Sequence, residues 1–183
     1  MAGLSGRLDG LTSGHIIVAM ATIELPPDLA SLPRWGFADP GALREKLIAL
    51  AIAGTKTTTA GLLVELELEG DIPRPGDREI MIDSSDRPVA LVETVDCPVK
   101  RLADVDDRHA IDEGEGWANA AEFRVDHERF WTSYIDDLRL RLGDPSFEID
   151  DDTLIVCQRF RILATIDPTT GEVTWREPAT SGG

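Results

Sequence analysis

The middle of the chain contains two runs of strand-forming residues, and a turn sequence introduces each of them. Residues 75–77 precede the run at 78–83, and residues 84–87 precede the run at 89–95. These turn sequences contain Pro, Gly, Ser and Asp, which supply the backbone conformations and local hydrogen bonds that a chain reversal needs. A third apolar run of the same type covers residues 153–163. We therefore expect a fold built around a β-sheet.

Residues 40–53 have the pattern of a helix that precedes these strands. Leucines recur on one face of the segment at helical spacing, and charged residues occupy the opposite face. Asp39 suits the N-cap, Pro40 suits the first helical position, and Gly54 suits the position just past the end. The helix is therefore predicted to end at the polar segment that begins with Gly54.

Further helical patterns follow the strands. Residues 106–116 predict a short acidic helix, and residues 119–142 predict the longest helix, with apolar and aromatic side chains at helical spacing. Residues 64–69 alternate as a strand does, but their apolar residues also fit one face of a helix, so both assignments stay open. This order of elements predicts an α+β fold, a small barrel-like mixed sheet with flanking helices.

The chain divides into one central domain and two terminal segments. Its length of 183 residues suits a single domain with tails. Residues 1–33 are expected to be a partly disordered N-terminal extension, in which the apolar patch at 16–23 can add a strand, and Met20 would make a natural start. The folded domain is predicted at 34–165. Residues 166–183 are predicted to form a C-terminal hairpin and a disordered tail.

The charge of the chain restricts its partners. It has 18 Lys and Arg against 34 Asp and Glu, which gives a formal net charge of −16 at pH 7. Because the mean field of such a protein repels phosphate, generic binding to nucleic acid or to a membrane surface is disfavoured. Any chemistry on nucleic acid must therefore use a local basic cleft or a small substrate.

The sequence predicts no metal site, no cofactor and no disulfide. Cys97 and Cys157 stand alone in apolar stretches without zinc-ligand spacing, so each is expected to be a buried free thiol. His109 and Glu113 are four residues apart, but two groups alone do not make a metal site. No apolar run is long enough to span a membrane. We predict a cytoplasmic protein with no membrane partner, and the oligomeric state stays open.

Two short segments contain residues suited to catalysis. In the first, Lys56 and Thr59 are three apart, so their side chains can lie side by side in a helix or turn. A Thr hydroxyl becomes a nucleophile when a base removes its proton, and a Lys is such a base when burial or a nearby cation lowers its pKa. In the second segment, Glu113 could hold the lysine ammonium or relay protons to a leaving amine. The alternatives are a polar loop and a solvated helix end.

Taken in order, these segments and the strands between them resemble the ASCH domain family, in particular its longer bacterial members. The resemblance rests on the pattern G-x-K-x-x-T after the first helix, G-D before a strand, and A-x-x-E-G in the acidic stretch, and it covers residues 34–163. The matching residues are Gly54, Lys56, Thr59, Gly76, Asp77, Ala110, Glu113 and Gly114.

This resemblance implies a PUA-like β-barrel with flanking helices, whose cleft receives RNA or a nucleoside. In some members it also implies a hydrolase in which a Lys/Thr/Glu triad cleaves the amide of an N-acylated cytidine. Carried over, Thr59 would be the nucleophile or the hydroxyl that orients water, Lys56 its base, and Glu113 the acid/base partner. Two alternatives stay open: a ribonuclease acting on single-stranded RNA in the same cleft, and a non-catalytic module that binds RNA or nucleotides.

Five further residues are candidates for substrate binding. Trp35 and Phe37 precede the first helix and could stack on a base, a contact worth about 1–3 kcal/mol; packing against that helix is the alternative. Thr57 offers a second hydroxyl beside Thr59. Arg124 and Arg159 could contact a phosphate or a carbonyl, although surface salt bridges are the alternative role for both.

Overall fold

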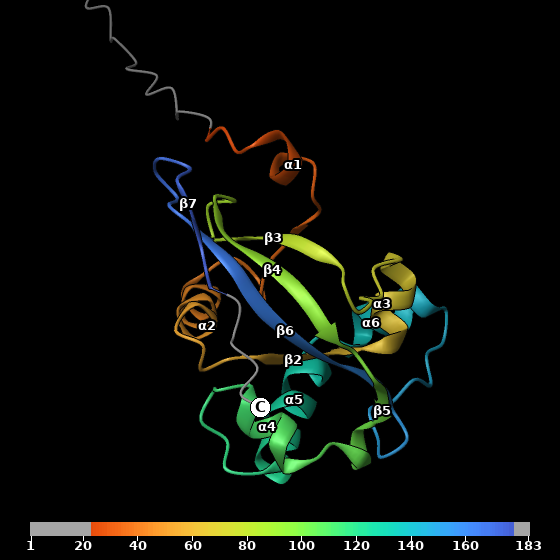
Figure 1. The fold of residues 1–183 in the computed structure, drawn as a ribbon. Coiled ribbons are helices and arrows are strands. Elements are labelled where there is room, and N and C mark those ends of the chain that lie inside the picture. The colour runs from red at the N-terminus through yellow and green to blue at the C-terminus, as the bar shows by residue number, and fades with distance from the viewer. Residues whose placement is uncertain (1–22, 178–183) are drawn as a thin grey trace, which may run out of the picture.

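A computed structural model gives the fold of the chain, and the structure describes residues 23–177 (Figure 1). Residues 1–22, which hold most of the predicted N-terminal extension, and residues 178–183, which hold the predicted tail, lie outside the described residues. Within the described part, a curled mixed sheet forms a half-barrel that α-helices flank. The predicted α+β class is confirmed.

The sheet is organised around one long strand, β6 (Leu154–Ile166), which pairs with four other strands. The main order is β1-β3-β4-β6-β2, and β5 and β7 also pair with β6. The β1–β3 pair is parallel, and all other pairs among the described residues are antiparallel. The remaining strands are β1 (Arg34–Trp35), β2 (Thr58–Leu62), β3 (Arg78–Ile82), β4 (Pro88–Asp96), β5 (Val99–Arg101) and β7 (Val173–Trp175).

The three strands expected at residues 78–83, 89–95 and 153–163 are present, whereas β2 was not expected. Its sequence begins in the polar threonine run, which pattern analysis treats as a loop. The β-branched Thr side chains nevertheless suit a strand, and all five residues of β2 pair with β6. The G-x-K-x-x-T pattern therefore leads directly into the sheet.

The helices differ from the predictions in where they begin and end. The described helices are α1 (Pro27–Ala30), α2 (Ala42–Ile52), α3 (Leu63–Glu69), α4 (Asp107–Asp112), α5 (Ala120–Thr132) and α6 (Ile135–Leu142), with a short 3-10 helix at Leu102–Asp104. The ambiguous residues 64–69 are helical, as part of α3. None of the helices within residues 23–177 is long and apolar enough to cross a membrane.

The expected start of α2 at Pro40 with an Asp39 cap is wrong. Gly41 is the N-cap, and no side chain of its own caps the helix. Instead, Ser84 in the turn before β4 accepts a hydrogen bond from the Gly41 amide at 2.9 Å. Because this partner is 43 residues away, local sequence does not reveal it.

The single helix predicted over residues 119–142 is also wrong, because it breaks between α5 and α6. At the break, the amide and the hydroxyl of Ser133 both donate to the carbonyl of Phe130. The hydroxyl of Tyr134 donates to Glu65 of α3 at 3.0 Å. The redirected chain lets α6 pack beside α3 (Figure 1).

Two apolar clusters support the site that lies between them. One lies under α2 and includes Phe37, Leu47 and Phe160. The other lies under α4, α5 and α6 and includes Phe123 and Trp131. Since burial of each large side chain contributes about 1.5–3 kcal/mol, these clusters hold α2, the sheet and α5 in fixed relative positions.

Candidate active site

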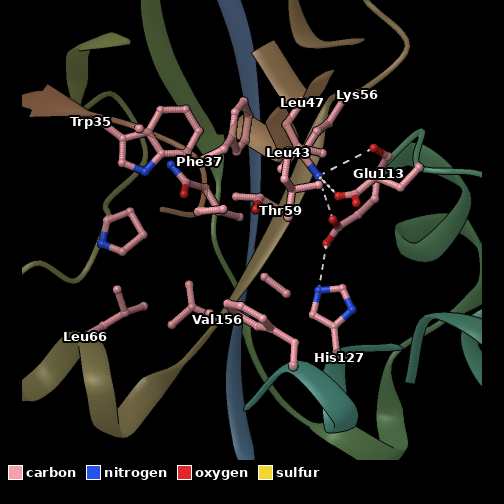
Figure 2. A pocket seen from close by; sticks show the side chains of 18 of the residues that line it. Trp35, Phe37, Leu43, Leu47, Lys56, Thr59, Leu66, Glu113, His127 and Val156 are labelled. Atoms are coloured by element: carbon pink, nitrogen blue, oxygen red, sulfur yellow. Dashed lines mark hydrogen bonds and ion pairs between the residues drawn. The ribbon is translucent and has the colours of Figure 1, made fainter. Parts of the chain in front are cut away.

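The residues that the sequence singles out for catalysis lie on the wall of a cavity of about 900 Å³ (Figure 2). Lys56, Thr59 and Glu113 line it, together with the aromatic side chains of Trp35 and Phe37. Its volume falls in the range of about 300–1,000 Å³ that is typical of small-molecule sites. The walls come from α2, α3, α5, β2, β6 and the segment that follows α4.

The register of β2 selects Thr59 among the three adjacent threonines. Thr59 lies opposite Gln158 of β6, so their side chains share one face of the sheet, and both line the cavity. The Thr58 hydroxyl donates instead to the His109 carbonyl at 3.0 Å. The Thr57 hydroxyl donates to the Asp112 carbonyl at 3.4 Å. Of the three hydroxyls, only that of Thr59 belongs to a cavity-lining residue.

Lys56 is a buried cation between two carboxylates. Its side chain is 1% exposed, and Nζ lies 2.6 Å from Glu113 Oε2 and 2.7 Å from Glu115 Oε1. The ammonium also lies 5.3 Å from the centre of the Phe37 ring, at a distance suited to a cation–π contact. Burial of a charge is tolerated when it is paired and hydrogen-bonded, and both conditions hold here.

The two carboxylates differ in their affinity for protons. Burial alone would raise the pKa of Glu113, but the charge of Lys56 and the adjacent His109 ring more than offset it and lower this pKa to about 2. Burial raises the pKa of Glu115, and Lys56 offsets that effect only in part. The ammonium is thus flanked by one carboxylate that stays ionised and one that takes up a proton more readily. Pairs whose pKa values are pushed apart in this way are typical of acid/base sites.

A family model described as the ASCH domain matches residues 33–164. The chain belongs to the ASCH domain family. An ASCH domain structure from Lactobacillus crispatus superposes with a TM-score of 0.62 at 20% identity, covering 74% of this chain and 81% of that chain. A crystal structure of an Enterococcus faecalis protein, described under the family model DUF984, superposes with a TM-score of 0.61 at 23% identity. The match covers 73% of this chain and 77% of that chain. These likenesses confirm the predicted PUA-like fold. No curated protein matches the chain.

Three predicted substrate-binding residues of this ASCH domain do not line the cavity: Thr57, Arg124 and Arg159. Thr57 is turned toward the Asp112 carbonyl, as described above. Arg124 in α5 is partly exposed and pairs with Glu128 and Asp151, each at 2.6 Å. Arg159 follows Gln158 in β6, so it projects from the opposite face of the strand and pairs with Asp112 at 2.7 Å.

The two predicted aromatic residues do line the cavity, but they differ in exposure. Phe37 is 4% exposed and belongs to the core under α2. Trp35 is half-buried, and its ring centre lies 4.5 Å from that of Phe37 and 5.8 Å from that of Phe160. Trp35 is therefore the better placed of the two to contact a ligand.

The sequence analysis missed several residues that line the cavity, among them Glu115, His127, Gln158, Arg78 and Arg129. Glu115 was detectable, since it lies two residues after Glu113 in the same acidic stretch. His127 was hidden in the apolar stripe of the helix predicted over residues 119–142. Within residues 23–177, no cluster of three or more His, Cys, Asp or Glu side chains is arranged to hold a metal ion.

A glycine between the two carboxylates makes their arrangement possible, and its replacement is our first prediction. Gly114 has φ +67, and a Cβ there would lie 2.5 Å from the Thr55 carbonyl oxygen. Gly114→Ala should therefore lower the free energy of unfolding by about 2–4 kcal/mol, through a left-handed backbone and a steric clash. Gly143→Ala is the matched control, because Gly143 has the same φ of +67 and nothing lies within 4 Å of its Cβ. Equal losses for the two variants in urea unfolding would contradict the close approach.

Proposed function

We propose that this ASCH domain is a hydrolase that cleaves the amide of an acylated cytidine, with the nucleoside rather than RNA as its substrate. The observation that supports it most is the buried Lys56, held by two carboxylates beside Thr59 at the wall of the cavity of about 900 Å³. Figure 2 places this group on one side of the cavity, with Trp35 on the other. A base stacked on Trp35 would thus direct its substituent toward Lys56 and Thr59.

The charges around the cavity favour an uncharged substrate. Three cationic side chains line it, and each forms an ion pair: Lys56 with Glu113, Arg78 with Glu93 at 2.9 Å, and Arg129 with Asp126 at 2.7 Å. Six acidic residues line the same cavity: Asp71, Asp77, Glu79, Glu113, Glu115 and Asp126. Six acidic residues against three cations give the wall a net negative charge, which repels phosphate, so this cavity suits a nucleoside better than a polynucleotide.

Glu79 in β3, which also lines the cavity, adds to this preference for an uncharged substrate. Burial and the neighbouring carboxylates of Asp71 and Asp77 raise the pKa of Glu79 to about 7. A half-buried carboxyl with such a pKa can donate or accept a hydrogen bond near neutral pH. It therefore suits the polar edge of a neutral ligand rather than a phosphodiester.

In this proposal Thr59 attacks the amide carbonyl or orients the attacking water, as the family resemblance implies. Lys56 can act as a base only after it has released a proton. Glu115 is suited to receive this proton, since it lies 2.7 Å from Nζ and burial raises its pKa. Glu113 keeps its charge and holds Lys56 in position. The two carboxylates would thus divide the work that the sequence assigned to Glu113 alone.

The second prediction tests this function directly. Purified protein incubated with 4-N-acetylcytidine should release cytidine, detected by chromatography. Because the substrate is uncharged, turnover should change less than about twofold between about 50 and 200 mM salt, whereas binding of RNA through several phosphates would weaken by orders of magnitude. Cleavage of labelled single-stranded RNA with a steep salt dependence would support the ribonuclease alternative. Binding of RNA without any product would support the non-catalytic module.

A further inference from the structure

Glu113 has a second carboxylate oxygen that faces two histidines. While Oε2 contacts Lys56, Oε1 lies 3.4 Å from His109 Nε2 and 3.9 Å from His127 Nε2. Both Oε1 and His109 Nε2 are buried, and neither has a hydrogen bond of good geometry within residues 23–177. Both atoms therefore keep unused hydrogen-bonding capacity, and Oε1 can still accept a hydrogen bond.

The tautomer of His127 follows from its other ring nitrogen. Nδ1 lies 3.1 Å from the Phe123 carbonyl oxygen, which can only accept, so Nδ1 carries the proton. In the neutral ring, Nε2 is consequently an acceptor. Stacking on Phe123, with ring centres 3.8 Å apart, fixes the orientation of the ring. Figure 2 shows this nitrogen directed at the Glu113 carboxylate along the cavity wall.

Two acceptors thus face each other across 3.9 Å, a separation that one bridging water molecule would match. If a water oxygen lies about 2.8 Å from each acceptor, the directions from it to the two acceptors enclose an angle of roughly 90°. This is close to the angle between the two O–H bonds of water. A buried carboxylate oxygen without a donor is unfavourable, and the bound water would supply that donor. His127 lines the cavity, so a water bound there is within reach of the substrate space.

We propose that Glu113 Oε1 and His127 Nε2 bind the water molecule that is consumed in the hydrolysis, and that His127 is the base that takes its proton. This inference rests on the proposed hydrolase function. It adds to the Lys/Thr/Glu triad a catalytic residue from α5, and it gives each oxygen of Glu113 a separate task. Oε2 holds Lys56, and Oε1 holds the water.

The proton balance of this step closes within the site. The water oxygen forms a bond to the carbonyl carbon, and its proton moves to His127 Nε2. When the C–N bond breaks, its electron pair goes to the amine nitrogen, which takes the proton back from the imidazolium. The products are a carboxylic acid and the free exocyclic amine, and His127 is neutral again. If Thr59 attacks first, the same step describes hydrolysis of the acyl-enzyme, with the Thr59 oxygen as the leaving group.

The surroundings of His127 favour its neutral form. Burial, with the charge of Lys56 and the His109 ring as smaller contributions, lowers the pKa of His127, while Glu113 and the Phe123 carbonyl oppose this. The ring is thus a free base at neutral pH. Turnover should fall only when the pH drops below this lowered pKa, at a more acidic pH than for an ordinary histidine.

Two experiments test the inference, and the first of them does not depend on the proposed function. The first is a high-resolution crystal structure of the wild-type protein, which should contain a water within hydrogen-bond distance of both atoms. Density without a water there would overturn the inference whatever the protein hydrolyses.

The second experiment measures the pH profile of hydrolysis of 4-N-acetylcytidine. His127→Gln should lower kcat by about 10²–10⁴-fold and remove the acidic limb, and imidazole should partly rescue His127→Ala. Val125→Ala, at a side chain of α5 that is 62% exposed and does not line the cavity, is the control that should match wild type. A His127→Gln enzyme with unchanged kcat and acidic limb would overturn the base role while the hydrolase stands. An inactive wild type would remove the proposed function and the base role together, leaving the water site to the diffraction result.

Discussion

Replacing Lys56 with methionine is expected to lower the free energy of unfolding by about 3–5 kcal/mol and to abolish hydrolysis. Methionine keeps most of the apolar volume of the side chain but removes its charge. Glu113, which is 1% exposed, then loses the ammonium at 2.6 Å, and Glu115 loses the same partner at 2.7 Å. Two carboxylates in one buried site without a cation repel each other, which destabilises the folded state. Urea unfolding and cytidine release measure the two effects.

Lys100→Met is the matched control for this variant. Lys100 also forms an ion pair at 2.7 Å, with Asp106, but that pair is much more exposed. Its loss should cost no more than about 1 kcal/mol. If Lys56→Met proved as stable as Lys100→Met, the buried ion pair would not have the importance given to it here.

A double variant separates the loss of stability from the loss of catalysis. Combining Lys56→Met with Glu113→Gln removes the strongest unpaired charge, so the double variant should be more stable than the sum of the single losses predicts. It should still be inactive, because the proton-transfer group is missing. A stable and active double variant would contradict the role of Lys56 in the proposed hydrolase.

The elements that sequence patterns predicted correctly are those determined by local chemistry. The strands β3 and β4 follow turn sequences that leave few other conformations, and the apolar run of β6 suits a strand that is buried for most of its length. The predictions for the start of α2 and the end of α5 were wrong because these boundaries depend on distant contacts. A hydrogen bond with Ser84 in a distant turn caps the start of α2. The end of α5 is accompanied by packing between α3 and α6.

The same distinction applies to the site. Lys56, Thr59 and Glu113 were recognisable because their order along the chain resembles a family motif, and the structure brings all three to one cavity. Which face of the sheet the Arg159 side chain projects from depends on how β6 pairs with β2, and residue spacing in the sequence does not give this pairing. His127 occupies one position in an apolar helical stripe, so only its contacts with Glu113 and Phe123 distinguish it from a core residue.

Lowering the pH should destabilise the wild-type protein through Glu113. Its pKa is about 2 in the folded protein and 4.5 as an ordinary glutamate, so the unfolded chain binds the proton more readily. The stabilisation is therefore fully present above about pH 4.5, and it is lost as the pH falls toward about 2. A difference of this size corresponds to about 3 kcal/mol at neutral pH. The contribution of Glu115 to the pH dependence of stability has the opposite sign. Because its pKa is raised in the folded protein, the folded state takes up a proton at a higher pH than the unfolded chain does.

Comparison with Glu113→Gln isolates this contribution from those of the other carboxylates. Glutamine preserves the shape of the side chain but does not titrate, so urea unfolding of the two proteins at several pH values between about 7 and 3 gives the contribution of Glu113 by difference. The wild type should be the more stable at neutral pH, and its advantage should shrink steadily below about pH 4.5. Asp104→Asn also removes a carboxyl whose pKa an arginine lowers, but its ion pair with Arg101 is exposed, so its difference from wild type should be small throughout this range. An advantage over Glu113→Gln that does not change with pH would mean that Glu113 titrates as an ordinary carboxyl, and that Lys56 does not hold it ionised.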